Sequence, residues 1–194
     1  MKHLLAAATL TLATTGAQAQ DGPVAIGTLP QGSLGYAIAA GVAQVAGAET
    51  GIDLRAVGQG GSSVFIPALN RGAIDFSTSN AFEAVFATQG TGNFDGTPNP
   101  DIRVAAMLQP FEVGIMVAAD SDIHSLADLE GAPFPVGYAR QRLVGVMQEA
   151  VFAAAGIDAA DIDGVPVPNF VEGANLLAQG SVAGVMLAPG SGVV

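Results

Sequence analysis

Apolar and polar positions follow two different periods along the chain, and their alternation predicts an α/β protein. Short apolar runs at 24–27 and 52–57 are typical of buried strands. Between them, the apolar residues of 34–45 recur every three or four positions, which is the spacing of one helix face. The order strand, helix, strand is the usual opening of a parallel sheet, because parallel neighbours need a crossover connection.

Glycine and serine mark where the next elements begin and end. After the turn at 60–62 we expect a second helix with Ser62 or Ser63 as its N-cap, because a serine hydroxyl accepts a hydrogen bond from the first turn. Gly72 is expected to end that helix, since glycine readily adopts the left-handed conformation found after a helix. A strand at 73–77 completes the predicted β-α-β-α-β unit.

The middle of the chain predicts a crossing between two lobes. A Gly-, Asn- and Pro-rich stretch at 88–100 is typical of a surface loop, and two apolar runs follow at 102–108 and 113–118. A second α/β unit then begins, with helices expected at 125–131, 141–155 and 171–179 and strands at 134–137, 165–167 and 182–187. We therefore divide the chain into a first lobe, 20–112, and a second lobe, 113–194.

The first 19 residues have the pattern of a secretory signal peptide. Lys2 and His3 precede an apolar run at 4–12, and small residues stand at the expected cleavage site, 17–19. That run is too short to span a bilayer, and no later window holds about 18 apolar residues without Gly, Pro or charge. The mature chain is therefore expected to begin at Gln20 and to act in the periplasm.

The net charge and the residue types present exclude several classes of partner and of catalytic site. Beyond the expected signal peptide, five arginines stand against 17 acidic residues, which disfavours nucleic acid and anionic lipid as partners. The sequence has no Cys, and His124 is the only imidazole after residue 3. Thiolate nucleophiles, His-based triads and multi-His zinc sites are thus excluded, and we expect no metal and no cofactor.

Three polar segments follow the expected strands of the first lobe, at 28–36, 58–63 and 77–80. Parallel sheets bind ligands where their strands end, because helix N-termini there offer free N–H groups. These loops are neutral, polar and small, which suits a small polar or anionic ligand. The alternative is that Gly and Ser only form tight turns.

Two of the five arginines fall together in the second lobe. Arg140 and Arg142 lie where a strand is expected to end and a helix to begin, a position at which a cation opposes the helix dipole. An anion that bridges a guanidinium and the free N–H groups would explain them. Alternatively, both side chains extend into water.

The carboxylates near the expected cleft leave an enzyme as an open alternative. Glu83 and Glu112 are the two candidates, and an exported hydrolase would use such a pair as general acid and base. Turnover of a glycoside or ester would support that alternative.

Five motifs in this order resemble the solute-binding receptors of the TAXI branch of TRAP transporters, which have the type II periplasmic binding protein fold. The resemblance spans nearly all of the mature chain. It rests on IGTLPQGSLGY at 26–36, QGGS at 59–62, NRGAIDF at 70–76, SLADLEG at 125–131 and PNFVEGA at 168–174.

The resemblance implies two α/β lobes that close on a small organic carboxylate or amino acid, often glutamate-like, and deliver it to a sodium-driven permease. Such a receptor is not an enzyme. The crossover at 108–117 would be the hinge, and the closed form would be recognised by the permease. The residues implied to contact the ligand are Gln31, Ser33, Tyr36, Gln59, Gly60, Gly61, Ser62, Ser79 and Asn80 in the first lobe and Tyr138, Arg140 and Gln141 in the second.

The chain departs from the family in two respects. Members often have a Gly-, Ser- and Thr-rich turn where this chain has YARQR at 138–142, so the identity of the ligand transfers less well. Members are also longer, so we expect a fragment of the two-lobed fold that is incomplete at its C-terminus, with exposed core and unpaired sheet edges. The first alternative is a periplasmic binding protein for an ABC importer or a sensor, which a neighbouring permease gene would decide.

Overall fold

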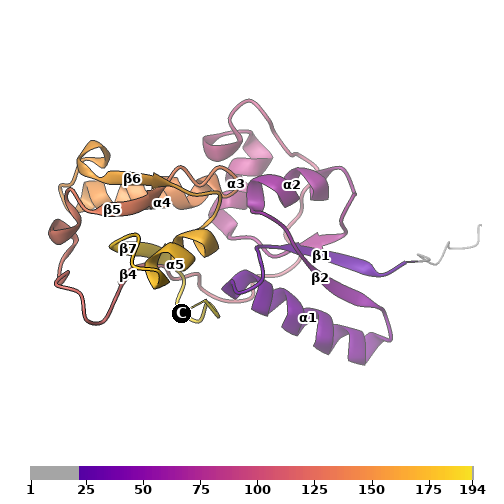
Figure 1. The fold of residues 1–194 in the computed structure, drawn as a ribbon. Helices are drawn as coiled ribbons and strands as arrows, with labels where there is room; N and C mark the ends of the chain where they lie inside the picture. Colours follow the sequence, from indigo (N-terminus) through magenta and orange to yellow (C-terminus); the bar gives the residue numbers. More distant parts are fainter. Residues whose placement is uncertain (1–21, 194) are drawn as a thin grey trace, which may run out of the picture.

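The computed structural model describes residues 22–193, so the predicted signal peptide lies outside the described residues. Two groups of helices and strands lie side by side, the first lobe running from β1 to η1 and the second from β4 to β7 (Figure 1). In this part of the chain, every helix is too short or too polar to cross a membrane.

The first lobe is a parallel sheet of order β2-β1-β3 with helices packed on it. Val24 pairs with Leu54 and Ile26 with Phe76, so all three strands end at the same edge. The elements are β1 (Val24–Thr28), α1 (Leu34–Thr50), β2 (Leu54–Gly58), α2 (Ser62–Asn70), β3 (Phe76–Ser77), α3 (Ala81–Gln89) and the short 3-10 helix η1 (Gly92–Phe94).

Apolar residues on both faces of the sheet hold this lobe together. Phe65, Ile66 and Phe94 are buried on one face. Ile26 packs with Ala39 of α1 on the other. Burial of large side chains on both faces is what a parallel sheet needs, because neither face is left to water.

The second lobe contains two pairs of strands, β5-β6 parallel and β4-β7 antiparallel. The N–H of Ala183, just before β7, donates to the carbonyl of Pro133 in β5 at 2.8 Å, which joins the two pairs edge to edge. The elements are β4 (Gly114–Val117), η2 (Leu126–Leu129), β5 (Pro133–Val136), α4 (Arg142–Ala154), η3 (Ala159–Asp161), β6 (Asp163–Pro166), α5 (Phe170–Ala178) and β7 (Gly184–Leu187).

The order of the predicted elements is confirmed, with three corrections to caps, bounds and faces, and α3 was not predicted. The N-cap of α2 is Gly61, not Ser62 or Ser63, and no side chain caps this helix. The strand expected at 73–77 forms only as Phe76–Ser77. Val45, assigned to the apolar face of α1, is 66% exposed, so it lies off the buried face of this helix, which carries Ala39 and Ala43.

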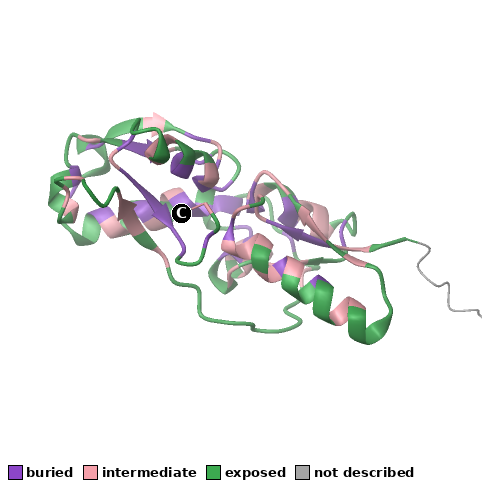
Figure 2. Ribbon diagram, turned by 60° about the horizontal axis from the view of Figure 1, so that its bottom comes forward, coloured by how far each residue is buried: buried purple, intermediate pink, exposed green. Residues whose placement is uncertain are grey.

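The crossover between the lobes, expected around the apolar runs at 102–108 and 113–118, is found at 102–113. Its first apolar run, 102–108, lies outside any helix or strand, and Val104 and Met107 are 66% and 72% exposed. Figure 2 shows this segment as an exposed trace joining the lobes. The apolar pattern is that of a strand, but a strand also needs a neighbour to pair with, and the described residues place none beside it.

The C-terminal residues run back from the second lobe to the first. A Cβ placed on Gly190 would lie 3.7 Å from the Leu34 side chain at the start of α1, and Val193 lies directly against Gly32. The chain therefore connects the lobes twice, at the crossover and behind β7 (Figure 1).

Candidate functional site

The two lobes touch where the loop after β2 meets the loop after β5. A Cβ placed on Gly60 would lie 2.7 Å from Cδ of Arg140 and 3.1 Å from its Nη1. A Cβ placed on Gly61 would lie 3.1 Å from Cβ of Gln141 and would overlap the carbonyl group of Arg140. Only glycine fits at position 61, because the backbones of the two loops are in direct contact there.

One hydrogen bond crosses this contact, and bonds within the second lobe hold the residues that make it. Nδ2 of Asn169 donates to the carbonyl oxygen of Gly60 at 3.3 Å, while its Oδ1 caps α5 by accepting from the N–H of Glu172. Oε1 of Gln141 accepts from the N–H of Phe170, the first residue of α5. Asn169 and Gln141 are both buried, so the contact is a packed interface rather than a passing approach of two loops.

The helices that begin at this contact are the two that lack a capping side chain. Ser33, Asn80 and Asn169 cap α1, α3 and α5, whereas Gly61 and Gln141, the N-caps of α2 and α4, offer no side-chain bond. Within 22–193, the N–H groups of the first two residues of α2 (Ser62, Ser63) and α4 (Arg142, Leu143) have no acceptor. Two positive helix ends therefore meet between the lobes.

Arg140 adds a full positive charge to this region. Its side chain is exposed, and among the described residues its guanidinium makes no ion pair or hydrogen bond. The ion pair found among the described residues is elsewhere: it joins Arg55 of β2 to Asp53 in the turn before that strand, and both residues lie on the surface. The contact thus holds two helix N-termini and a guanidinium, a combination that is stabilised by an anion.

A buried polar cluster lies behind the first turn of α2. Ser62 Oγ donates to Oε1 of Glu83 at 2.6 Å, and Nδ2 of Asn93 donates to the same oxygen at 2.9 Å. Glu83 is only 4% exposed, and burial raises the pKa of its carboxyl, although the two hydrogen bonds act in the opposite direction. Ser63 Oγ, one residue further on, is buried and has no hydrogen-bond partner among the described residues.

The residues expected to contact a ligand fall into groups. Gly60 and Gly61, which follow Gln59, lie at the inter-lobe contact with Arg140 and Gln141. Gln31 and Tyr36 lie one strand away, beside Gly58, at 3.5 to 3.6 Å from a Cβ placed there.

Four of the expected residues have their polar groups engaged within their own lobe. The hydroxyl of Ser33 and the amide of Asn80 cap helices. Ser79 Oγ lies 3.2 Å from Ser77 Oγ, and the hydroxyl of Ser62 is used by Glu83.

Tyr138 does not line the cleft, contrary to the expectation. Its side chain is fully buried in the core of the second lobe, and its hydroxyl donates to Oε1 of Gln148 in α4 at 2.9 Å. Burial raises the pKa of this phenol well above its usual range. The backbone of Tyr138 has a φ of 38°, a conformation that non-glycine residues rarely adopt. Packing of the buried ring stabilises this conformation, and the ring thereby anchors the loop that presents Arg140.

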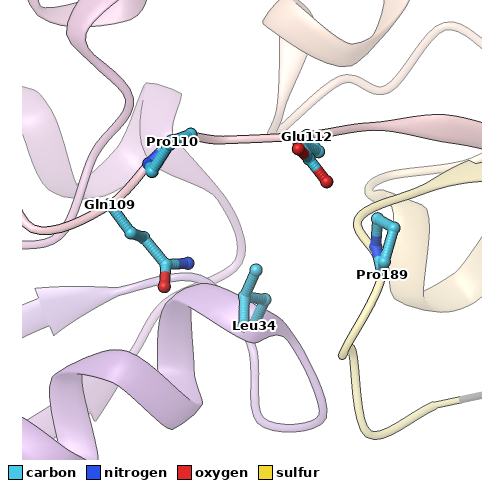
Figure 3. Close-up of a pocket in the computed structure, with 5 residues that line it drawn as sticks. All are labelled: Leu34, Gln109, Pro110, Glu112 and Pro189. Carbon is cyan, nitrogen blue, oxygen red and sulfur yellow. The ribbon is translucent and has the colours of Figure 1, made fainter.

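A cavity of about 260 Å³ lies on the crossover side of the molecule. Figure 3 shows Gln109, Pro110 and Glu112 of the crossover around one space with Leu34 of α1 and Pro189 behind β7. Glu112 is on this cavity, whereas Glu83 is buried under α2, so the two carboxylates of the hydrolase alternative have different surroundings.

Sequence reasoning missed several residues of the site. Asn169 carried a usable signal, because it follows a strand and stands three positions before Glu172, the spacing of a helix cap. Ser63, Asn93 and the role of Glu83 had no local signal, since their contacts join residues that are far apart in the sequence.

The chain matches one family model and several solved structures. The model of the NMT1-like family matches residues 26–194. Similar solved structures include the alkanesulfonate-binding protein SsuA from Xanthomonas axonopodis pv. citri bound to MOPS, with 19% identity, a TM-score of 0.52 and coverage of 84% of this chain and 53% of that one.

Two further neighbours share the fold. The arginine-bound form of a truncated ArgBP from T. maritima is 18% identical, with a TM-score of 0.55 and coverage of 88% and 75%. PhnD1 from Prochlorococcus marinus (MIT 9301) in complex with methylphosphonate is 13% identical, with a TM-score of 0.63 and coverage of 86% and 63%. The chain spans about half the length of the SsuA neighbour. The predicted fold class, that of the two-lobed periplasmic binding proteins, is confirmed.

Proposed function

We propose that this protein, which belongs to the NMT1-like family and has the fold of periplasmic solute-binding proteins, holds a small organic anion between its two lobes. The observation that carries the proposal is the contact between the N-caps of α2 and α4, beside Arg140. Two positive helix ends and a guanidinium repel one another, and a bound anion turns that repulsion into attraction.

The chemistry of the donors favours an oxyanion. The N–H groups of Ser62, Ser63, Arg142 and Leu143 and the guanidinium of Arg140 are all donors, and each oxygen of a carboxylate, sulfonate or phosphonate accepts more than one bond. Three solved neighbours are bound to MOPS, to methylphosphonate and to arginine, which is consistent with a small polar ligand here. We retain a small carboxylate or a glutamate-like amino acid as the first ligand class to test.

Binding would close the lobes around the ligand. The crossover at 102–113 is exposed, is outside any sheet and connects the lobes, which suits a hinge. The end of the expected hinge, 114–117, is instead strand β4, paired with β7. Contacts from both lobes would stabilise the closed form over the open one, so the ligand itself would shift the equilibrium. The proposed contact residues that remain from the sequence are Gln31, Tyr36, Gln59, Gly60, Gly61, Ser62 through its backbone N–H, Arg140 and Gln141. To these we add Ser63, Arg142, Leu143 and Asn169.

The partner we propose is a membrane permease that receives the solute in the periplasm. A TRAP permease is the choice that the sequence resemblance implies. An ABC importer is the second candidate, because the solved neighbours include a sulfonate-binding and a phosphonate-complexed protein of the same fold. The permease gene encoded beside this one would distinguish the two candidates.

The experiment is a thermal melt with methanesulfonate, methylphosphonate, succinate or L-glutamate, and with ethanolamine as a cationic control. An anion at a hundredfold excess over its dissociation constant should stabilise the protein by about 2.7 kcal/mol, a shift of roughly 5 to 10 °C. Arg140→Ala should remove most of that shift, whereas Arg71→Ala, which deletes an exposed arginine at the end of α2, should not. No shift with any anion, or a full shift in Arg140→Ala, would contradict the proposal.

A further inference from the structure

Glu83 is a carboxyl group buried without a cationic partner. It is only 4% exposed and accepts hydrogen bonds from Ser62 and Asn93, both of which are neutral. An isolated carboxylate is costly to bury, so such groups are usually paired with a cation or take up a proton.

The charged groups around Glu83 can be followed element by element. On its own helix, α3, it is the acidic residue of the first turn, and its N–H is bonded to Asn80. Helix α2 contributes no charged residue between 62 and 70, and η1 contributes none between 92 and 94. The nearest charges at the ends of these elements are Asp95 and Arg71, both exposed, and the second lobe presents Arg140 and Arg142. Among the described residues, none of these four forms an ion pair with Glu83.

The position of Glu83 ties it to the proposed anion site. Its partner Ser62 is the first residue of α2, directly after the glycines that touch Arg140. Both hydrogen bonds end on Oε1, so Oε2 can take up a proton without either bond being broken. The cluster is also short of donors, because Oδ1 of Asn93 is buried with no donor among the described residues. A surplus of acceptors favours the protonated acid.

We propose that Glu83 is a positioning residue for the first turn of α2, and that its carboxyl takes up a proton when an anion binds beside that turn. This inference rests on the proposed function. Without an anion, the positive N-terminus of α2 favours the ionised form of Glu83 and opposes the burial that favours the neutral acid. A bound anion becomes the counter-charge to that N-terminus and repels the carboxylate, so the neutral acid is favoured while Ser62 stays in place.

Proton uptake and anion affinity are thermodynamically linked, so the proposal can be measured as a change of affinity with pH. If binding takes up a proton, affinity must fall as the pH rises, by up to tenfold per pH unit for one whole proton. We expect the affinity at pH 6 to exceed that at pH 8 by about tenfold, because partial uptake over two units gives a smaller change than the limit.

The test is isothermal titration of the full chain with methanesulfonate and with L-glutamate at pH 6 to 8, in buffers of different ionisation enthalpy. Their acidic groups stay ionised over this range, so proton uptake belongs to the protein. Glu83→Gln keeps an oxygen acceptor for Ser62 and Asn93 and should bind with no uptake and a flat pH profile. Glu149→Gln, on an exposed part of α4, should behave as the parent protein does. The ¹³C resonance of the Glu83 carboxyl, titrated with and without the anion, gives the same answer without a substitution.

The outcomes separate the two proposals. Proton uptake that disappears in Glu83→Gln, with a higher Glu83 pKa in the bound protein, would support the inference. Anion binding without uptake, uptake that persists in Glu83→Gln, or an unchanged Glu83 resonance would overturn it and leave the proposed function standing. If neither anion binds at any pH, the proposed function fails and this inference fails with it.

Discussion

A methyl group at Gly61 should hold the two lobes apart. In the structure, a Cβ at this position would lie 2.5 Å from the carbonyl carbon of Arg140 and would overlap its oxygen, whereas real Cβ atoms essentially never come within 3.0 Å of another heavy atom. Both obstructing atoms belong to the backbone of the loop before α4, so rotation of a side chain cannot relieve the clash. The nearer obstructing atom is the carbonyl oxygen, so the Gly61→Ala chain must separate the loops by more than about 1 Å, and by about 1.5 Å for an ordinary contact.

The magnitude follows from the cost of overpacking. Extra methyl groups in packed sites cost about 1 to 3 kcal/mol, and this site is at the upper end because two backbones meet. A penalty of about 2 to 3 kcal/mol on the closed arrangement lowers anion affinity about 30- to 150-fold. Gly60→Ala should have a smaller effect, since its Cβ would mainly displace the flexible side chain of Arg140.

The assay measures the lobe separation directly. The sequence has no cysteine, so Gln44→Cys on α1 and Ala153→Cys on α4, both exposed, give one pair of spin labels. Gly61→Ala should lengthen the mean distance between the labels and weaken binding of the anion that the parent binds best. Gly114→Ala, where a Cβ meets no atom within 4 Å, should change neither. A parental distance and parental affinity in Gly61→Ala would refute the reasoning that this contact is part of the bound state.

Three further predictions concern single groups. Tyr138→Phe leaves Oε1 of Gln148 buried without its donor, so urea unfolding should show a loss of about 1 to 2 kcal/mol; a loss below 0.3 kcal/mol would contradict this. Asn169→Asp keeps the oxygen that caps α5 but loses the donor to Gly60, so affinity in a titration should fall several-fold with the melting temperature nearly unchanged, and the reverse pattern would assign Asn169 to stability alone. Burial raises the pKa of Glu83 above its ordinary value of 4.5, so the folded state holds its proton more tightly than the unfolded state does. The parent protein should therefore lose stability relative to Glu83→Gln as the pH rises from 4.5 through that higher pKa. A constant difference in unfolding free energy between the two chains would show that Glu83 titrates normally.

The elements of the fold could be predicted from sequence because their causes are local. Ser125 and Asp128 form a capping box at η2, as their three-residue spacing indicates, and Gly131 ends that turn with a φ of 72°. Gly156 similarly follows α4 with a φ of 78°. Such signals need only a few neighbouring residues, so the sequence holds all that is required.

The crossover and the site depend on contacts that no local pattern records. The apolar run at 102–108 has the composition of a strand, but pairing depends on a neighbour elsewhere in the fold. The family resemblance implied that Tyr138 lines the cleft, yet its ring packs in the core, where a bulky apolar group is stabilised more than at a wet surface. The contact between Gly61 and Arg140 joins positions 79 residues apart and could be found only from the folded chain.

The most direct test of the account is an NMR titration that follows four backbone amides, those of Ser62, Ser63, Arg142 and Leu143, while the best-binding anion of the thermal panel is added. The account predicts that all four amide resonances move and saturate at one ligand concentration, because both helix N-termini contact the same anion. Shifts confined to one lobe, or centred on Leu34 and Glu112 at the crossover cavity, would contradict it.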